Sequence, residues 1–375
     1  MGLSVVIAPD SFKGSLGARE VAEAIAAGWS SVRPEDVLTL IPQADGGEGT
    51  LDAIEAAVAG AVRRDAGSVT GPDGNPTSGA WLELPDGTAV VELAQMCGLP
   101  LMARLDPLGA STVGLGEVIR TALDAGASRL VVGLGGSAST DAAAGALAAL
   151  GLRADAPLTA GGGALAALGL LDRTRLITPP SGGVTLLTDV SAPLLGPTGA
   201  AAVFGPQKGA SPDEVALLEA ALTNFAALLG GDPSLPGTGE AGGAAFGFAA
   251  AWGARIESGA DYLSAHTGVL EAVAGADALV TGEGKFDATS STGKLVGSLI
   301  CLAGEHGLRV AVIAGQLAVP PLNTDGSPLW ACGLADLAGS TDAAMADPVW
   351  WLHAAGAAAA RSDWAFPTHG GQLRR

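Results

Sequence analysis

Short apolar runs, each followed by a glycine-containing loop and a helical pattern, constrain this fold most. In chain order, the runs are LSVVIAP, VLTLIP, ALVTG, RVAVIAG and ACGLADL. Continuous apolar runs without alternation are typical of strands that are buried on both faces of a parallel sheet. Helices are expected at Leu16 to Trp29, Thr50 to Val62 and Gly293 to Glu305, with a last one ending near Arg361. The pattern predicts a five-stranded parallel sheet covered by helices.

The middle of the chain interrupts this pattern. From about Ser68 to Glu92 the sequence is typical of hairpins, and two further apolar runs, RLVVGL and VTLLTDV, follow it. An alanine-rich helix is expected from Asp141 to Leu150. We therefore predict an α/β protein of two domains. The first is a discontinuous flavodoxin-like, doubly wound parallel-sheet domain (residues 1–66 and 275–375), and the second is an α/β domain inserted at residues 67–274.

Charge and composition narrow the classes of partner. The formal net charge of −19 disfavours nucleic acid and anionic membranes. No apolar run approaches the roughly 18 residues of a membrane span, and the N-terminus has no basic leader pattern. Three scattered cysteines favour a reducing compartment, and four isolated histidines show no metal-ligand spacing. We expect a cytoplasmic protein, and the sequence leaves its oligomeric state open.

Lysine is rare in this chain and is therefore informative. Among 19 lysines and arginines, the lysines are Lys13, Lys208, Lys285 and Lys294, and the last two share the stretch TGEGKFDATSSTGKL. In so acidic a chain, a small anionic ligand needs local donors such as lysines and glycine-exposed backbone N–H groups. We expect these lysines to mark an anion site, although Lys208 could also be a surface turn residue.

Acidic residues follow the predicted strands. Because the carboxyl ends of parallel strands share one edge, we expect a single crevice there. It would be lined by Asp10, Lys13, Asp45, Glu48, Glu283, Lys285 and Asp287. The second domain would add Ser137, Asp141 and Asp189 at its own strand ends. The alternative for Asp10, Ser11, Asp45 and Asp141 is helix capping.

These residue types suit phosphoryl transfer better than acyl or glycosyl transfer. Carboxylates can hold Mg²⁺ and accept a proton, while lysines and amides neutralise charge on the transferred group. The segment GLGGSA (residues 133–138) also matches the G-x-G-x-x-A dinucleotide fingerprint, which leaves an NAD(P)-dependent oxidoreductase of a small hydroxy acid as an alternative. A non-catalytic small-anion sensor is a further alternative. TSSTGKL is not a Walker A loop.

Several long motifs resemble the glycerate kinases of the bacterial type-I family. They are APDSFKGSLGAREVAEAI, ADGGEGT, GLGGSASTDAAAGALAALG, LLTDVSAPLLGPTGAAAVFGPQKGAS and ADALVTGEGKFDATSSTGK. The resemblance implies ATP- and Mg²⁺-dependent phosphorylation of D-glycerate, on a fold of two α/β domains with the ligand between them. It leaves open whether the 2- or the 3-hydroxyl is phosphorylated.

The chain also departs from that family pattern. The family usually has Thr-Asn-Asp-Gly-Gly at residues 139–143, where this chain has Ser-Thr-Asp-Ala-Ala. It usually has asparagine at Ala192, arginine at Lys285 and glutamine at Thr289. Lysine keeps the positive charge of arginine but not its bidentate geometry.

With the family in view, we assign hypothetical roles. Lys13, Ser11 and the N–H groups after Asp10 would bind the glycerate carboxylate, while Asp45 and Glu48 would bind its hydroxyls. Glu283 and Asp287 would hold Mg²⁺, and Asp189 would be the catalytic base, assisted by Lys13, Asp45 and Lys294. The nucleotide phosphates would contact Gly135, Gly136, Ser137, Asp141, Lys208, Lys285 and Lys294.

Overall fold

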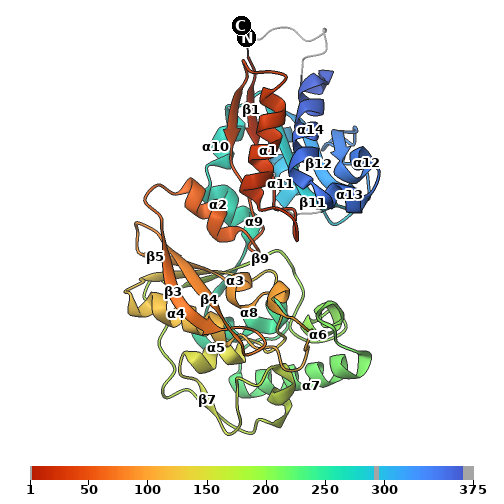
Figure 1. The fold of residues 1–375 in the computed structure, drawn as a ribbon. Helices are drawn as coiled ribbons and strands as arrows, with labels where there is room; N and C mark the ends of the chain where they lie inside the picture. Colours follow the sequence, from red (N-terminus) through yellow and green to blue (C-terminus); the bar gives the residue numbers. More distant parts are fainter. Residues whose placement is uncertain (1, 291–294, 366–375) are drawn as a thin grey trace. The chain divides into compact units, whose positions relative to one another are not determined.

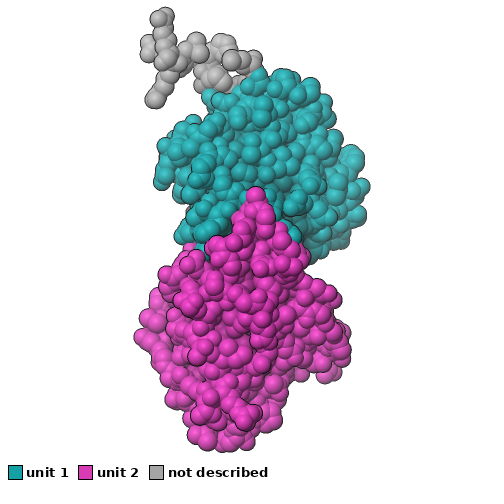
Figure 2. All heavy atoms as spheres, turned by 90° about the vertical axis from the view of Figure 1, so that its left-hand side faces the viewer, with its two compact units in different colours: residues 1–44, 52–57, 260–375 teal, residues 45–51, 58–259 magenta. Residues whose placement is uncertain are grey.

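The chain forms two compact units, coloured separately in Figure 2. The computed structural model describes residues 2–290 and 295–365. Unit 1 comprises residues 1–44, 52–57 and 260–375, and unit 2 comprises residues 45–51 and 58–259. The predicted bounds placed residues 45–51 and 58–66 in the first domain, but they belong to unit 2. Residues 260–274 were placed in the inserted domain, but they belong to unit 1.

Unit 1 is built on a five-stranded parallel sheet with the order β13-β12-β11-β1-β2 (Figure 1). Its strands are β1 (Ser4–Ile7), β2 (Val37–Leu40), β11 (Ala278–Phe286), β12 (Arg309–Leu317) and β13 (Trp330–Gly333). In chain order this is 2-1-3-4-5, one of the two common orders of doubly wound sheets. The predicted parallel sheet of N- and C-terminal strands is confirmed.

Helices cover both faces of this sheet. Val5 and Ile7 of β1 pack in the cluster that includes α1 and α14, whereas Val6 packs in the cluster that includes α10 and α11. Glycines let α1 and α14 touch, because a Cβ at Gly28 would overlap the carbonyl group of His353. The helices of unit 1 are α1 (Ala18–Ser30), α2 (Thr50–Ala57), α9 (Gly259–His266), α10 (Val269–Ala274), α11 (Leu295–Glu305), α12 (Leu334–Ala338), α13 (Thr341–Ala346) and α14 (Pro348–Arg361), followed by the 3₁₀ turn η4 (Asp363–Ala365).

Three local predictions in unit 1 are corrected. The GEGKF segment, predicted as a loop, continues β11, because Glu283, Lys285 and Phe286 pair with the equally extended β12. The edge strand β2 is not buried on both faces, since Val37 is 66% exposed. Helix α2 ends at Ala57 rather than near residue 62, where the next strand begins.

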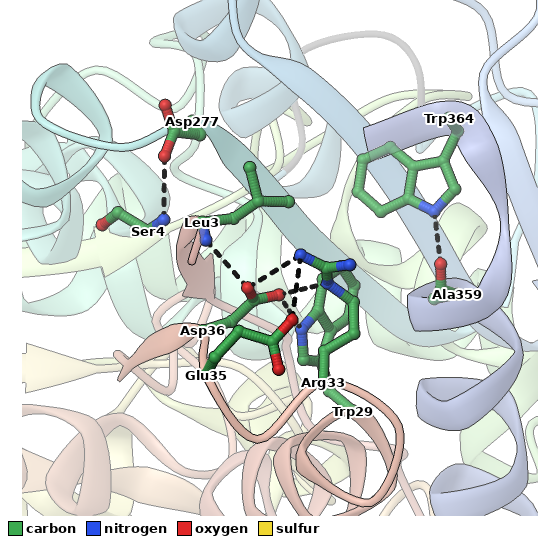
Figure 3. A network of polar contacts seen from close by, with 9 residues as sticks. All are labelled: Leu3, Ser4, Trp29, Arg33, Glu35, Asp36, Asp277, Ala359 and Trp364. Carbon is green, nitrogen blue, oxygen red and sulfur yellow. Dashed lines mark hydrogen bonds and ion pairs between the residues drawn. The ribbon is translucent and has the colours of Figure 1, made fainter. Parts of the chain in front are cut away.

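Asp36 fixes the start of β2 to the rest of unit 1 (Figure 3). Its carboxylate accepts hydrogen bonds from Leu3 N at 2.8 Å, Trp29 Nε1 at 2.9 Å and Arg33 Nε at 2.5 Å. Burial acts to raise the pKa of Asp36, but the hydrogen bonds from Arg33, Leu3 and Trp29 outweigh it and lower that pKa. These contacts fix the amino ends of β1 and β2, away from the edge where their loops emerge.

Unit 2 contains a mixed six-stranded sheet with the order β10-β9-β6-β5-β4-β3. Strands β10, β9, β6 and β5 are parallel to one another. Strand β4 is antiparallel to β5, and β3 is antiparallel to β4. The sheet comprises β3 (Val62–Thr70), β4 (Pro76–Glu83), β5 (Thr88–Glu92), β6 (Arg129–Gly133), β9 (Val184–Thr188) and β10 (Arg255–Ser258), and a separate pair is formed by β7 (Arg153–Ala154) and β8 (Leu171–Asp172). The predicted hairpin region is therefore part of the same sheet as the later strands.

The helices of unit 2 surround one large apolar core. They are α3 (Leu93–Cys97), α4 (Val113–Asp124), α5 (Ala144–Ala149), α6 (Ala200–Phe204), α7 (Pro212–Leu229) and α8 (Glu240–Trp252), with the 3₁₀ turns η1 (Leu99–Leu101), η2 (Gly162–Ala167) and η3 (Pro206–Lys208). Over the described residues, no helix combines the length and apolar character needed to cross a membrane.

The helix predicted from Asp141 begins only at Ala144. Ala142 and Ala143 have φ values of 48° and 60°, in the left-handed region that favours glycine. The Ala142 N–H donates to the Gly242 carbonyl at 3.0 Å instead of entering a helix. Tertiary hydrogen bonding thus overrides the high helix propensity of alanine here.

Candidate active site

The carboxyl edge of the unit 1 sheet, hereafter the first edge, brings two predicted segments together. Asp10, after β1, donates its N–H to the Gly282 carbonyl of β11 at 2.8 Å. A Cβ at Gly284 would lie 3.4 Å from Phe12 Cα and 3.5 Å from Lys13 N, so the loop and the strand are in contact. The first edge therefore gathers Asp10, Ser11, Lys13, Glu283, Lys285 and Asp287.

Asp10 and Ser11 are not helix caps. Helix α1 starts at Ala18, and its N-cap is Gly17. Both side chains are buried, at 6% exposure each, and Asp10 Oδ1 accepts a hydrogen bond from Ser11 N at 2.6 Å. The buried Ser11 hydroxyl has no hydrogen-bond partner among the described residues. An unsatisfied buried hydroxyl beside a carboxylate calls for a ligand.

The end of β11 carries charges of both signs. Glu283 and Lys285 are two residues apart in the strand, so their side chains leave the same face, with Glu283 half-buried and Lys285 exposed. Asp287 Oδ1 accepts hydrogen bonds from Thr289 N at 2.9 Å and Thr289 Oγ1 at 2.6 Å, which fixes its orientation. Lys294 lies outside the described residues.

The carboxyl edge of the unit 2 sheet, hereafter the second edge, gathers the other predicted residues. Gly133 pairs with Leu187, so Gly135 and Asp189 each lie two residues past paired positions of β6 and β9. The 45–49 loop packs on this edge, because Gly46 O accepts from Gly135 N at 3.2 Å. A Cβ at Gly136 would lie 3.4 Å from Glu48 Oε1, so the Glu48 side chain covers Gly136. In unit 2, the structure thus unites Asp45, Glu48, Gly135, Gly136, Ser137 and Asp189.

Asp45 forms a local turn rather than a helix cap. Its Oδ1 accepts from Gly47 N at 3.0 Å, three residues before α2 begins at Thr50. The predicted crevice included Asp45 and Glu48 among the loops of the first sheet, but these two residues belong to unit 2. The reason is packing: a Cβ at Gly46 would lie 3.0 Å from Leu187 Cβ in β9.

Lys208 is buried behind the second edge, with 2% exposure. Its Nζ donates to Ser137 Oγ at 2.8 Å and to the Ser139 carbonyl at 2.5 Å. Burial lowers the pKa of Lys208 to about 8, although the negative charges of Glu240 and Asp141 oppose this shift. Lys208 therefore supports the 135–139 loop from the protein interior and is not a surface turn residue.

Asp141 is fully buried, and its contacts correct the role predicted for it. Its Oδ2 accepts hydrogen bonds from Thr112 N at 2.9 Å, Thr112 Oγ1 at 2.8 Å and Gly145 N at 3.2 Å. Thr112 is the N-cap residue of α4, and Gly145 lies in the first turn of α5. Burial raises the pKa of Asp141, and the bonds from Thr112 and Gly145 oppose that rise. Asp141 is therefore not itself an N-cap residue, since the N-cap of α5 is Ala143, but it supports the starts of α4 and α5 from the interior.

Two glutamates of unit 2 were missed by the sequence reasoning. Glu240 accepts from Thr188 Oγ1 at 3.1 Å, and burial raises its pKa against the opposing charge of Lys208. Glu92 is 4% exposed and accepts from Gly49 N at 3.2 Å and Leu51 N at 3.0 Å. Glu240 follows a glycine in PGTGEAGG, the same signal that singled out Glu48 and Glu283. Glu92 ends an apolar strand and carries no such signal.

The dinucleotide fingerprint lacks its structural context. The GLGGSA segment follows β6, but the next helix, α5, begins only at Ala144 and has 6 residues. The fingerprint requires the glycine loop to open a helix directly, so that the helix N-terminus faces the pyrophosphate. The turn at Gly135 to Ser137 therefore opens no helix, and anion binding there would depend on loop N–H groups and on the charge of Lys208.

Carboxylates at the first edge fit a magnesium ion. Mg²⁺ is usually held by one or two carboxylates together with phosphate oxygens and water. Glu283 and Asp287 supply two carboxylates near the end of one strand. Within residues 2–290 and 295–365, no group of three or more histidine, cysteine, aspartate or glutamate side chains is arranged to hold a metal ion.

Comparisons with known proteins give the site its context. Residues 5–362 match the model of the glycerate kinase family. An Escherichia coli K12 protein named glycerate 2-kinase is 38% identical, over 84% of this chain and 86% of its own. A Bacillus subtilis glycerate kinase is also 38% identical, with the same coverage. A crystal structure provisionally named glycerate kinase 2, from Salmonella typhimurium LT2, has a TM-score of 0.74 and 32% identity, and the match covers 96% of this chain and 98% of that one.

Proposed function

The chain belongs to the glycerate kinase family, and on this premise we propose that it transfers the γ-phosphoryl group of ATP to a hydroxyl group of D-glycerate. The observation that carries the proposal is at the first edge. There the buried Ser11 hydroxyl has no hydrogen-bond partner among the described residues, and the buried Asp10 and the exposed Lys13 flank it in sequence. The order of the unit 1 strands supports the finer proposal that this unit is flavodoxin-like.

The residues of the first edge bind and orient the reactants. Lys13, Ser11 and the N–H groups after Asp10 bind the glycerate carboxylate through charge-assisted hydrogen bonds. Lys285 and Lys294 neutralise charge on the nucleotide phosphates. Glu283 and Asp287 would hold Mg²⁺, which would supply positive charge against the negative charge of the nucleotide phosphates.

The residues of the second edge activate the acceptor and bind phosphate. Asp189 accepts the proton of the attacking glycerate hydroxyl group. The hydroxyl oxygen bonds to the γ-phosphorus, while the bond between the γ-phosphorus and the β–γ bridging oxygen breaks and ADP leaves. Asp45 and Glu48 bind the glycerate hydroxyls. The loop at Gly135 to Ser137, supported by Lys208, donates N–H groups to the transferred phosphoryl group.

An ADP-release assay tests the proposal. We expect ADP formation with D-glycerate and less with L-glycerate or other hydroxy acids. No ADP with any acceptor would refute the kinase proposal and favour the small-anion sensor. Reduction of NAD(P)⁺ with a hydroxy acid and no need for ATP would favour the oxidoreductase. Since one relative is named glycerate 2-kinase, we propose 2-phosphoglycerate as the product, and ³¹P NMR distinguishes it from the 3-phospho isomer.

Two variants test the assigned roles. Asp189→Asn should lower kcat by roughly 10²–10⁴ with little change in ATP binding, because it removes the base. Asp124→Asn, the same change at an exposed position of unit 2, is its control. Ser11→Ala should raise the KM for D-glycerate about tenfold without lowering stability, because the hydroxyl has no internal partner to lose. Near-normal turnover of Asp189→Asn would remove that residue from the mechanism.

A further inference from the structure

A cavity of about 460 Å³ opens on unit 1, beside the first edge. Its walls come from the first two turns of α11, from the loop that follows β12, and from Ala288, next to Asp287. Both loops leave the carboxyl ends of their strands, the edge of a parallel sheet at which ligands bind. The volume lies within the range of roughly 300–1,000 Å³ that is typical of small-molecule sites.

The lining of this cavity suits an uncharged, flat ligand. Apolar contacts come from Ile300, Val319, Pro320 and Leu322, and no side chain among the lining residues carries a formal charge. Leu322 is 49% exposed, a large apolar surface left open at the rim. Phosphate groups would find no counter-charge here, whereas an uncharged ring would bury apolar surface.

One amide adds polar recognition to the apolar walls. Asn323 Oδ1 accepts a hydrogen bond from Thr324 N at 2.9 Å, and the Asn323 N–H donates to the Ser327 carbonyl at 2.8 Å. These bonds fix the residue in the loop and leave its Nδ2 without a partner among the described residues. An amide donor at the rim of an apolar slot suits a ring-nitrogen acceptor.

A second cavity on unit 1 differs in chemistry. It measures about 290 Å³, shares Gly297 and Cys301 of α11 with the first cavity, and includes the acidic Asp261 and Glu305 in its lining. Carboxylates would repel an anionic nucleotide. The larger, uncharged cavity is therefore the one that fits the neutral end of a nucleotide.

We infer that the cavity between α11 and the loop after β12 binds the purine base of the nucleotide, with the phosphates directed toward Asp287. The inference rests on the proposed kinase function, because it takes Asp287 as a ligand of the Mg²⁺ that accompanies the phosphates. It assigns base recognition to unit 1, through Ile300, Val319, Leu322 and Asn323.

Cys301 provides a probe of ligand binding at α11; because it lines both cavities of unit 1, the Leu322 variant described below distinguishes the first cavity from the second. It is exposed, whereas burial raises the pKa of Cys97 to about 12 and that of Cys332 to about 11. At pH 7.5, iodoacetamide should therefore modify Cys301 first. We expect saturating MgADP, and adenosine at higher concentration, to slow alkylation of Cys301 at least tenfold by peptide mass spectrometry, whereas inorganic tripolyphosphate leaves the rate unchanged.

A substitution in the cavity gives an independent readout. Leu322→Asp should raise the KM for ATP at least tenfold with the KM for D-glycerate unchanged, while Leu337→Asp, a similarly exposed leucine on α12 outside the cavity, should change neither. If ADP forms but MgADP does not slow alkylation and Leu322→Asp has a normal KM for ATP, the inference is wrong and the kinase proposal stands. If no acceptor yields ADP, the kinase proposal fails, and the alkylation rates of the wild type and of Leu322→Asp with MgADP still decide whether the first cavity binds the base.

Discussion

The first and second edges contain the same kinds of residue but place them at different depths. At the first edge, Lys13 and Lys285 are exposed. At the second edge, Lys208 and Asp141 are 2% and 0% exposed and bind protein groups. Lys13 and Lys285 are therefore open to a ligand, whereas Lys208 and Asp141 support the protein behind the second edge. Depth, rather than residue type, separates the two roles.

The edges differ also in backbone strain. Among the described residues, the non-glycine positions with positive φ are Ala142, Ala143 and Ala241, all in unit 2. Each lies near the interior side of the second edge, where Ala142 N bonds to Gly242 O. The first edge makes its close approaches with glycines, such as Gly284.

The largest difference in stability between variants of the two edges should come from the buried Asp141. Asp141→Ala should lower the free energy of unfolding by about 3–5 kcal/mol, because it leaves the donors of Thr112 and Gly145 unsatisfied in the core. Asp287→Ala should cost less than about 1 kcal/mol, since its partner Thr289 is exposed, yet lower ADP formation at least tenfold. Urea unfolding and steady-state kinetics measure both. Equal stability losses would contradict the comparison.

The pH dependence of stability should single out Lys208. Its pKa is about 8 in the folded chain against 10.5 for an unburied lysine, so its stabilising contribution is complete above pH 10.5 and is lost as the pH falls through about 8. Relative to Lys208→Met, the wild type should gain up to about 3 kcal/mol of unfolding free energy as the pH rises from 7 to 10.

Urea titrations at several pH values check this gain. Lys285→Met, which removes a lysine from the exposed first edge, is the matched control. Burial raises the pKa values of Glu240 and Asp141, whose charges face Lys208, and both residues are present in the wild type and in Lys208→Met. A wild-type advantage over Lys208→Met that falls as the pH rises would overturn the assigned direction.

A smaller effect is expected at Lys285. Lys285→Ala should reduce kcat/KM for ATP about tenfold, or about 1.4 kcal/mol, by removing one charge from the phosphates. Lys285→Arg should match or exceed the wild type, because arginine binds phosphate with two parallel hydrogen bonds. Neither change should alter the urea midpoint appreciably, since the side chain is exposed. A stability loss without a kinetic loss would move Lys285 to the supporting group.

The smallest effect should come from the strained alanines. Ala143→Gly relieves a left-handed conformation but loses a buried methyl group, so we expect a net change within about 1 kcal/mol. Ala146→Gly, at a buried position inside α5, gains no such relief and should cost about 1–2 kcal/mol. Thermal unfolding of the two variants separates the cases, and equal losses would show that Ala143 is not strained.

The sequence predicted the first sheet because its signal is local. Each strand of unit 1 is an apolar run bounded by a polar loop, and burial on two faces explains that pattern for the inner strands β1, β11 and β12, although not for the edge strand β2. The extension of β11 was not predictable in this way, because GEGKF has the composition of a loop and its pairing partner in β12 lies at Gln316 and Leu317. This segment becomes a strand because it pairs with the neighbouring β12.

The sequence predicted which residue types gather at the two edges but not which of these side chains are buried. Glycine-flanked carboxylates and rare lysines marked most of the residues that the edges contain. Nothing local distinguishes Lys208 from Lys285, since burial of Lys208 depends on Ser137 and Ser139, far away in sequence. The same holds for Asp141, whose role is fixed by Thr112.

Because unit 1 consists of segments from both ends of the chain, the order of synthesis determines which unit can fold first. Strand β1 pairs with β11 through contacts such as Val5 with Ala278, and α1 packs on α14 near the other end of the chain. A ribosome has therefore made all of unit 2 before β1 meets its central partner. Because domains fold as units during synthesis and distant pairings form slowly, unit 2 should fold first. The N-terminal strands β1 and β2, which pair with each other, must wait for β11, and chaperones would find the other edge of β1 open in the nascent chain.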